Sequence, residues 1–432
     1  MDSTGADTIF ALSSGAPPAA VAIVRISGPE AGSALVALGG RLPQPRRATL
    51  TWLRDGVGGE VLDQALVLWF PAPRTATGED CAELHLHGGR AVIAAVERAL
   101  ARVPGLRRAQ AGEFTRRAFL HGRLDLAEAE GLADLLTAET ELQRRAAVAM
   151  SSGVLSRQTD AWRNSVLRLG AMVEAVLDFS DEDDGGDVSP SFAAEVDAVA
   201  AEIETWRARP RAELLRDGFS VVLAGPPNSG KSTLFNALTD SEAAIVSPHA
   251  GTTRDLITRM VAIEGVPFRF VDTAGLRDGS SDPIECTGID RAREAAADAD
   301  LVLWLGAFGQ CRSAGAVLEV APRQDEDASS PKPQPSLAIS AATGAGMACL
   351  RQRILDHARG ALPRPGEVAL ASRQHALLAD CAASLRQAAI CDDLVLIAEH
   401  LRSARAALDA LVGRTGTEAM LDALFSRFCI GK

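Results

Sequence analysis

Residues 218–238 read GFSVVLAGPPNSGKSTLFNAL, and they decide the fold of one domain. The apolar run FSVVLAG predicts a buried strand, and TLFNAL predicts the start of a helix. Between them, GPPNSGKS (225–232) matches the pattern GxxxxGK[ST]. A strand, a glycine-rich turn and a helix in this order predict a loop whose backbone N–H groups hold phosphates at the helix N-terminus.

Two side chains of this loop have a predicted chemical role. Lys231 is expected to reach the β- and γ-phosphate oxygens, and Ser232 is expected to ligate Mg²⁺. Only three of the 44 basic residues in the chain are lysines, and they are Lys231, Lys332 and Lys432. Because arginine stands almost everywhere else, a retained lysine indicates a place that needs a compact ammonium group.

Two further motifs follow the loop. VDTAG (271–275) closes a second apolar strand, which places Asp272 near the Mg²⁺ shell and the Gly275 N–H near a γ-phosphate. GTTRD (251–255) lies between the phosphate loop and VDTAG, and it supplies Thr253 as a second hydroxyl ligand for Mg²⁺. The three elements in this order predict a P-loop GTPase domain rather than a generic ATPase.

The water-orienting position departs from the usual pattern. Leu276 follows DTAG, where Ras-like GTPases carry a glutamine that orients the attacking water. Hydrolysis then needs another group, and Glu285 is the nearest suitable carboxylate. From the residues alone, a solvated loop acid is the competing interpretation of Glu285.

The guanine-reading motif NKxD is degenerate. Pro322-Arg323-Gln324-Asp325 occupies its position, so that Asp325 alone keeps the usual residue for the base N1–H and N2–H₂. The preceding segment, 306–316, is too short for a normal intervening helix. ISAAT (339–343) fits the later loop in which the Ala341 N–H meets the guanine oxygen.

The remaining chain predicts an α+β region followed by helices. A helix is expected over 90–102. The residues from 124 to 176 recur at helical spacing, as Leu132 and Leu136 and, further on, Trp162 and Val166 illustrate, so long helices packed as a bundle are expected. The expected strands are AAVAIVRIS (19–27), DQALVLWFPAP (63–73) and CAELHLHGG (81–89).

Helical patterns lie on both sides of the α/β unit, which suggests that this unit is inserted into one helical domain. Otherwise the flanking helices would form two small cores. The expected domains are 1–120 (α+β), 121–216 (helical, first part), 217–358 (GTPase) and 359–432 (helical, second part).

Composition narrows the functional class. The net charge of −12 is unlike that of a protein that holds RNA alone. No apolar run approaches the roughly 18 residues of a membrane span, and the N-terminus has no basic segment before an apolar one. The seven cysteines are scattered without a CxxC pair, which argues against a disulfide framework or a zinc site. A cytoplasmic location is therefore expected.

GPPNSGKST, AGTTRD, DTAGLR and the terminal FCIGK (428–432) together resemble the MnmE family, also called TrmE, of tRNA-modification GTPases. DTIFALSSG, LWFPAP and GEFTRRAFLHGRLDLAEAEGLADL resemble the same family, so the likeness covers nearly the whole chain. It implies a multidomain α/β and α fold. The parts would be an N-terminal α+β folate-binding and dimerisation domain, a helical bundle domain and an inserted Ras-like P-loop G domain.

The resemblance also implies cofactors and partners. Arg25, Glu83, Arg123 and Lys432 match folate-binding positions of the family, with Arg123 standing where many relatives have lysine. The ligand would be 5,10-methylene-tetrahydrofolate, with 5-formyl-tetrahydrofolate as an analogue. Its carbon would enter an aminomethyl or carboxymethylaminomethyl group on carbon 5 of the tRNA wobble uridine. The partners would be a second copy of the chain, in a homodimer, and the flavoprotein MnmG (GidA), in a heterotetramer.

In the G domain, the resemblance implies activation by K⁺. The ion would be ligated by Asn228, Ser247, the backbone of His249 and Thr252, and Glu285 and Lys231 would act in catalysis. The expected GTP-binding residues are Asn228, Ser229, Gly230, Lys231, Ser232, Thr233, Ser247, Thr252, Thr253, Asp272, Thr273, Ala274, Gly275, Asp325, Ser340, Ala341 and Ala342.

Two alternatives of other classes stay open from the sequence. A ribosome-assembly GTPase similar to Era or Der would usually carry a basic RNA-binding module, and the sequence shows none. A nucleotide-sensing scaffold with weakened hydrolysis is compatible with the degenerate base motif.

The degenerate base motif predicts weakened discrimination between nucleotides. Pro322 cannot brace the loop, so Asp325 holds the base less firmly, and hydrogen bonds to a charged group contribute roughly 1.5–3 kcal/mol. We expect weaker GTP binding than with an intact NKxD and a reduced preference for GTP over ATP. Competition titrations of GTP, ATP and XTP with wild type and Asp325→Asn measure this, and the variant should shift towards xanthine. Full discrimination in wild type with no shift in the variant would assign base reading to another residue.

Overall fold

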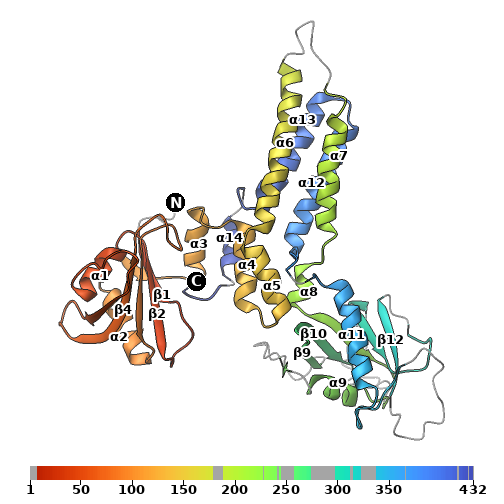
Figure 1. Ribbon diagram of the computed structural model, residues 1–432, viewed down its shortest axis with the longest axis horizontal. Helices are drawn as coiled ribbons and strands as arrows, with labels where there is room; N and C mark the ends of the chain where they lie inside the picture. The colour runs from red at the N-terminus through yellow and green to blue at the C-terminus, as the bar shows by residue number, and fades with distance from the viewer. Residues whose placement is uncertain are drawn as a thin grey trace, which may run out of the picture. The chain divides into compact units, whose positions relative to one another are not determined.

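The computed structural model describes residues 7–178, 188–226, 228–240, 243–244, 257–273, 297–311, 315–322, 337–364, 366–415, 418–426 and 428–431. The chain forms two compact units (Figure 1). The first contains Met1–Ala133 and Asp409–Lys432, and the second contains Asp134–Leu408. The predicted limits at residues 120, 216 and 358 stay predictions.

A six-stranded sheet forms the N-terminal part of the first unit. Its strands are β1 (Thr8–Leu12), β2 (Val21–Ser27), β3 (Thr49–Arg54), β4 (Val61–Phe70), β5 (Cys81–His87) and β6 (Leu106–Arg108). Their order is β3-β4-β5-β2-β1-β6, in which only the β1–β6 pair is parallel. The three strands predicted from the sequence are thus present as β2, β4 and β5.

One face of this sheet is packed against helices. Helices α1 (Ala31–Gly39) and α2 (Arg90–Leu100) share one apolar core with alternate sheet residues such as Ile26, Trp69 and Leu84. Because successive strand side chains point to opposite faces, Arg25 and Glu83 belong to the other face. The alternation therefore places charged side chains together on the face that the helices leave open.

The C-terminal residues pack within the same unit. Helix α14 (Glu418–Phe425) forms an apolar cluster with α4 (Leu126–Thr137), and α3 (Glu113–Leu120) precedes them in the chain. Ile430 then forms a β-bridge with Ala111. Gly431 has a φ of 97°, and a Cβ there would lie 2.0 Å from the carbonyl oxygen of Leu12. The close approach requires glycine and explains part of the terminal motif structurally.

A seven-stranded sheet organises the α/β part of the second unit. Its order is β13-β12-β11-β7-β10-β9-β8, parallel from β13 to β10 and antiparallel thereafter. The strands are β7 (Phe219–Ala224), β8 (Ala243–Ala244), β9 (Ile257–Ile263), β10 (Val266–Asp272), β11 (Leu301–Trp304), β12 (Ala316–Ala321) and β13 (Leu337–Ala338). Helices α9 (Lys231–Thr239) and α11 (Met347–Ala361) pack against it.

The connection from β11 to β12 is short, as predicted. Its described residues, 305–311 and 315, contain turns and no helix. The two strands nevertheless pair in parallel, with Leu301 beside Ala316. A parallel crossover usually carries a helix, and the described residues of this one form turns instead.

Helices form the rest of the second unit, namely α5 (Glu141–Ser151), α6 (Val154–Asp178), α7 (Phe192–Arg207), the short α8 (Ala212–Arg216), α12 (Ser372–Ile390) and most of α13 (Leu394–Leu411). The predicted stripe on α6 is buried, and Trp162 meets Trp206 of α7 edge to face at 5.5 Å. Leu136, which was predicted to share a buried stripe on α4, is 44% exposed. The buried residues of α4 all lie in its first half, so its last turn is left outside the packing.

The α/β part enters and leaves the helical part at one place. Arg211, just before α8, forms a parallel bridge with Leu370, just before α12. The backbone N–H of Ser372 donates to Glu213 Oε1 at 2.7 Å. The inserted arrangement predicted from the sequence is therefore present. Among the described residues, no helix combines the length and apolar character that a membrane crossing requires.

Candidate functional site

Lys231 is the central side chain of the phosphate loop. It begins α9, is 7% exposed, and its Nζ donates to the carbonyl oxygens of Gly225 at 2.9 Å and Pro226 at 2.8 Å. An ammonium group can satisfy both carbonyls because its three donors are arranged around one nitrogen. The loop thus holds a buried positive charge at the N-terminus of a helix, where anions are favoured.

The backbone of the loop takes unusual conformations next to this lysine. Asn228 and Gly230 have φ values of 59° and 86°, in the left-handed region that asparagine and glycine tolerate best. The hydroxyl oxygen of Ser229 is buried and has no hydrogen-bond partner among the described residues. Ser232 and Thr233 follow on α9 and are exposed. An unsatisfied buried hydroxyl beside a lysine fits a site completed by an oxygen-rich ligand.

The strand that carries the DTAG motif ends beside this loop. β10 pairs in parallel with β7, and Asp272 lies opposite Leu223. Asp272 is 3% exposed, and the Thr273 hydroxyl donates to the carbonyl oxygen of Leu223 at 2.6 Å. Ligands of open α/β sheets bind outside the carboxyl ends of the strands. The structure therefore brings Asp272 and Thr273 to the sheet edge at which the phosphate loop begins.

The predicted base loop begins at the carboxyl end of β13, in the same parallel sheet. Ser340 is buried, and its Oγ accepts a hydrogen bond of 3.1 Å from the backbone N–H of Thr343. Its own N–H donates to the carbonyl oxygen of Ala345 at 2.9 Å. These bonds fix a tight turn in which Ala341 is half-buried and Ala342 is exposed. Such a turn can present a backbone N–H to a ligand.

Several predicted site residues lie outside the described part of the chain. They are Ser247, His249, Thr252, Thr253, Ala274, Gly275, Glu285, Asp325 and Lys432.

A second site is a cavity of about 290 Å³ on the open face of the N-terminal sheet. Three of the four predicted folate residues, Arg25, Glu83 and Arg123, line it. The complete lining is Arg25, Arg46, Phe70, Arg74, Thr75, Ala76, Cys81, Glu83 and Arg123. The structure thus gathers, into one basic pocket, residues that are nearly one hundred positions apart in the sequence.

Arg25 and Glu83 form an ion pair in this pocket. They are opposite one another on the antiparallel strands β2 and β5. Arg25 donates to Glu83 Oε1 through Nε at 3.1 Å and Nη2 at 2.9 Å, and His85 Nε2 lies 3.4 Å from Glu83 Oε2. Arg25 also lies 5.9 Å from the ring centre of Phe114. The carboxylate is therefore held in place, with hydrogen-bonding capacity left for a ligand.

Comparison with known proteins decides the family. A family model described as "MnmE helical domain" matches residues 126–429, and one described as "GTP-binding protein TrmE N-terminus" matches residues 8–123. The chain belongs to the MnmE (TrmE) family. The predicted multidomain fold, with its α+β, helical and P-loop parts, is confirmed by this match and by the elements described above.

Full-length relatives agree with the family models. A protein of Novosphingobium aromaticivorans named "tRNA modification GTPase MnmE" is 60% identical and covers 99% of this chain and 100% of the relative. One of Erythrobacter litoralis with the same name is 58% identical, with coverage of 99% and 100%. The G domain of the T. maritima FeoB iron transporter matches 32% of this chain and 98% of its own, at 24% identity and a TM-score of 0.25. That TM-score is too low to support a structural argument.

Sequence reasoning missed residues that do not line the pocket on the N-terminal sheet but hold one of its loops in place. Arg117 is almost wholly buried, and its guanidinium donates to Glu79 at 3.2 Å and to Asp7 Oδ1 at 2.8 Å. Glu79 in turn accepts from the Ser27 hydroxyl at 2.7 Å. Burial acts to raise the pKa of Asp7, but the hydrogen bonds from Arg107 and Arg117 outweigh it and lower this pKa. This network anchors the loop that follows β4.

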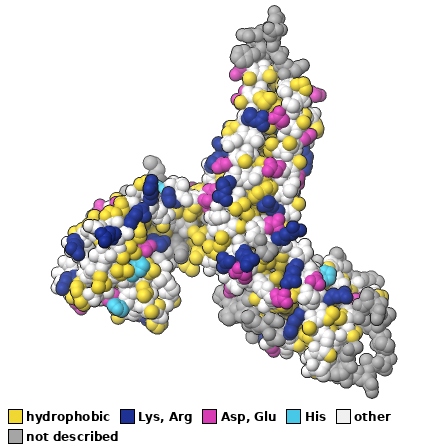
Figure 2. Space-filling model, in the orientation of Figure 1, with side chains coloured by type: hydrophobic (Ala, Val, Ile, Leu, Met, Phe, Trp, Pro, Cys, Tyr) yellow, Lys and Arg dark blue, Asp and Glu magenta, His cyan; other side chains and the backbone are white. Residues whose placement is uncertain are grey.

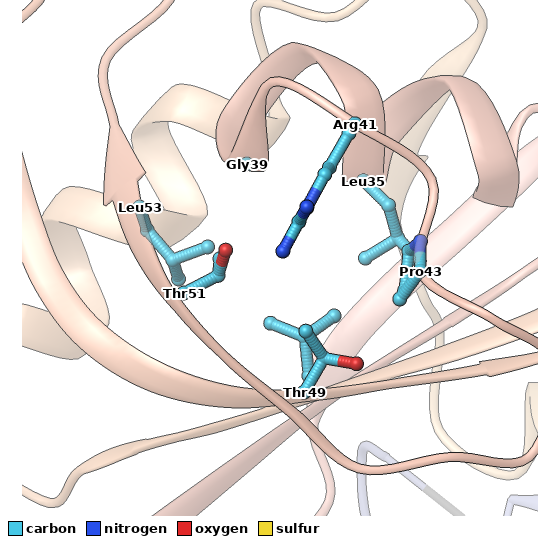
Figure 3. Close-up of a pocket in the computed structure, with 8 residues that line it drawn as sticks. Leu35, Gly39, Arg41, Pro43, Thr49, Thr51 and Leu53 are labelled. Carbon is cyan, nitrogen blue, oxygen red and sulfur yellow. The ribbon is translucent and has the colours of Figure 1, made fainter.

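The cavity in Figure 3 is of a different kind. It has a volume of about 10 Å³ and lies beside α1 and the strands β3 and β4. Its lining is Leu35, Gly39, Arg41, Pro43, Thr49, Thr51, Leu53 and Val67. A space of this size holds about one water molecule. It is a packing defect of the sheet–helix layer and not a ligand site.

The buried ammonium group of Lys231 predicts how replacement of this residue changes the affinity for GTP. We expect Lys231→Arg to weaken GTP binding about tenfold to a hundredfold, since a planar guanidinium cannot occupy the same buried position between two carbonyls and reach phosphate. Fluorescent GTP-analogue titration measures the effect. Lys332→Arg makes the same exchange at another of the three lysines and should bind like wild type. Equal affinity of Lys231→Arg and wild type would contradict the assigned role.

Proposed function

We propose that this chain is a K⁺-activated GTPase that acts, with the flavoprotein MnmG, on carbon 5 of the tRNA wobble uridine. The observation that carries the proposal is the phosphate loop with its buried Lys231, beside the end of the DTAG strand, in a full-length member of the MnmE family. GTP hydrolysis in tRNA modification is the activity named for the relatives.

The loop residues suit phosphate binding. Lys231 Nζ donates to two loop carbonyls, and it would in addition donate to a phosphate oxygen when GTP binds. Backbone N–H groups at the start of α9 add further donors. Ser232, with Thr253, would ligate Mg²⁺, which neutralises charge on the phosphates when it is bound. The unpartnered hydroxyl of Ser229 supports a site that an oxygen ligand completes.

Positive charge beside the phosphates would come from K⁺. Asn228, Ser247, Thr252 and the backbone of His249 are the proposed ligands, all of them oxygen donors that suit a hard cation. Glu285 would orient the attacking water, since Leu276 cannot. Pairing of two G domains in a homodimer would bring the ion between the β- and γ-phosphates.

The N-terminal pocket has the chemistry that a folate requires. Its volume of about 290 Å³ is close to that of small-ligand sites. Glu83 offers a fixed carboxylate acceptor for the N–H donors of a pterin, while the arginines suit the carboxylates of the glutamate tail. Arg25, Glu83, Arg123 and Lys432 would hold 5,10-methylene-tetrahydrofolate, which supplies the one-carbon unit when it is bound. 5-Formyl-tetrahydrofolate would bind as an analogue.

The charge distribution supports a division of labour with a partner. The chain carries a net charge of −12, and on the face shown in Figure 2 acidic and basic side chains are interspersed along α6 and α7. Mixed charge of this kind is a weak phosphate-binding surface. We therefore assign much of the tRNA binding to MnmG, in a heterotetramer, and to GTP hydrolysis the role of a conformational switch. A cytoplasmic location follows from these partners.

Potassium dependence is the first test. We expect K⁺ to raise GTP turnover far above that in equal Na⁺, and to promote G-domain pairing with GDP–AlFx, because the resemblance to the family implies K⁺ as the ion that these ligands hold. Glu285→Ala should lower kcat on the order of 10²-fold or more with nucleotide affinity nearly unchanged. Equal rates in the two salts would overturn K⁺ activation. If Glu285→Ala keeps wild-type turnover, another acid, Asp278 or Asp282, orients the attacking water instead.

The modified nucleoside is the second test. Mass spectrometry of tRNA from a deletion strain should show loss of the aminomethyl or carboxymethylaminomethyl group at the wobble uridine, and re-expression of wild type should restore it. Glu285→Ala should not restore it if hydrolysis gates the chemistry. Unchanged wobble nucleosides together with accumulated ribosomal precursors would favour a ribosome-assembly GTPase. Full rescue by the hydrolysis variant would favour a nucleotide-sensing scaffold.

A further inference from the structure

The pocket on the N-terminal sheet carries more positive charge than its acid balances. Four of its lining residues are arginines and one is an acid, Glu83. Arg25 is engaged by Glu83 through two hydrogen bonds of 3.1 and 2.9 Å. The guanidinium groups of Arg46, Arg74 and Arg123 have no carboxylate partner within the described part of the chain. Three unneutralised guanidinium groups around one small cavity predict a ligand with several anionic groups.

The lining groups are arranged in order along β4. Leu68 of β4 is opposite Glu83, and Phe70 is opposite Cys81, so that Phe70 lies about 7 Å further along the sheet than Glu83. The guanidinium of Arg46 lies 5.7 Å from the ring centre of Phe70. Arg46 also donates a hydrogen bond to the backbone carbonyl of Arg74. The pocket therefore runs from a carboxylate, past an aromatic ring, to a pair of arginines.

This order has a chemical counterpart. A folate has N–H donors at its pterin end, an aromatic ring in the middle and carboxylates at the glutamate end. We propose that Arg46 and Arg74 form an anion subsite for the glutamyl carboxylates and make the pocket prefer polyglutamylated folates. A single glutamate brings two carboxylates, and each added γ-linked residue brings one more to the unneutralised arginines. The inference rests on the proposed folate function of this pocket.

Exposure of the two arginines is compatible with an extended chain. Both side chains are exposed, Arg46 in the segment before β3 and Arg74 in the loop after β4. The carbonyl of Arg74 is fixed by Arg46, and the following residues are fixed by the Thr75 hydroxyl, which accepts from the Gly78 N–H at 2.9 Å. The subsite is thus anchored at its backbone while its charged ends are open to a ligand that continues out of the cavity.

Neighbouring Arg47 offers a matched control. It is exposed like Arg46, but its Nη1 donates to Gln44 Oε1 at 2.9 Å and it does not line the pocket. Replacing either arginine by glutamine removes one positive charge from the same segment. If surface charge in general attracts the ligand, both substitutions should weaken binding. If Arg46 belongs to a subsite, only the substitution at position 46 should weaken it.

Calorimetric titration of the full chain with 5-formyl-tetrahydrofolate tests the proposal at fixed salt. Wild type should bind the triglutamate about tenfold to a hundredfold more tightly than the monoglutamate. Arg46→Gln/Arg74→Gln should lose that preference, while Arg47→Gln should keep it. Since the substituted side chains are exposed, thermal melting of all variants should match wild type.

A third probe separates this inference from the folate function. p-Aminobenzoyl-triglutamate lacks the pterin, and it should bind wild type and Glu83→Gln alike but not the double variant. If folates bind without a chain-length preference, or if the double variant keeps the preference, the subsite is wrong and the folate function stands. If this fragment binds through Arg46 and Arg74 but no folate binds, the folate function is wrong. Failure of all three ligands to bind would overturn both.

Discussion

The parallel pairing of β7 with β10 is the constraint on which the nucleotide site depends. It places Asp272 opposite Leu223, so the chain that leaves β10 and the chain that leaves β7 begin at the same edge of the sheet. The Thr273 hydroxyl ties the two ends together through a bond of 2.6 Å to the Leu223 carbonyl. A slip of this register by one residue would reverse which side chains face the core, and Phe268 and Phe270 would leave it. The same β7–β10 register is therefore required both for the packing of the core and for the geometry of the site.

The N-terminal pocket depends on a different consequence of strand geometry. Strands β2, β4 and β5 bury alternate residues under α1 and α2, and the intervening residues are left on the open face. Antiparallel register then sets Arg25 against Glu83. The ionic network of the buried Arg117 with Glu79 and the half-buried Asp7 anchors the loop after β4. The alternation of side chains along the strands thus positions the pocket residues, and the ion pairs of Arg117 hold the neighbouring loop.

Periodicity and motif spacing predicted much of this arrangement, and their failures have physical reasons. Strands β2, β4, β5, β7 and β10 and the stripe on α6 follow local patterns, so the sequence was enough to predict them. Leu136 was misplaced because a helical stripe does not say how far along a helix its neighbour reaches. Arg46 and Arg74 gave no signal, since they come from irregular segments on either side of β3 and β4. Only the sheet order brings those segments to one cavity.

The arginine-rich composition has a different meaning at the two sites. At the phosphate loop, the chain keeps a lysine, whose buried ammonium satisfies two carbonyls within 2.9 Å and, in the proposed function, would also serve a phosphate. At the N-terminal pocket, all four cations of the lining are arginines, Arg123 among them. Planar guanidinium groups pair with carboxylates through two parallel hydrogen bonds and also lie over aromatic rings, and the guanidinium of Arg46 is 5.7 Å from the ring centre of Phe70. We therefore expect the exchange of lysine for arginine to be unfavourable at the enclosed phosphate loop and favourable at the open pocket, where the proposed ligand brings carboxylates.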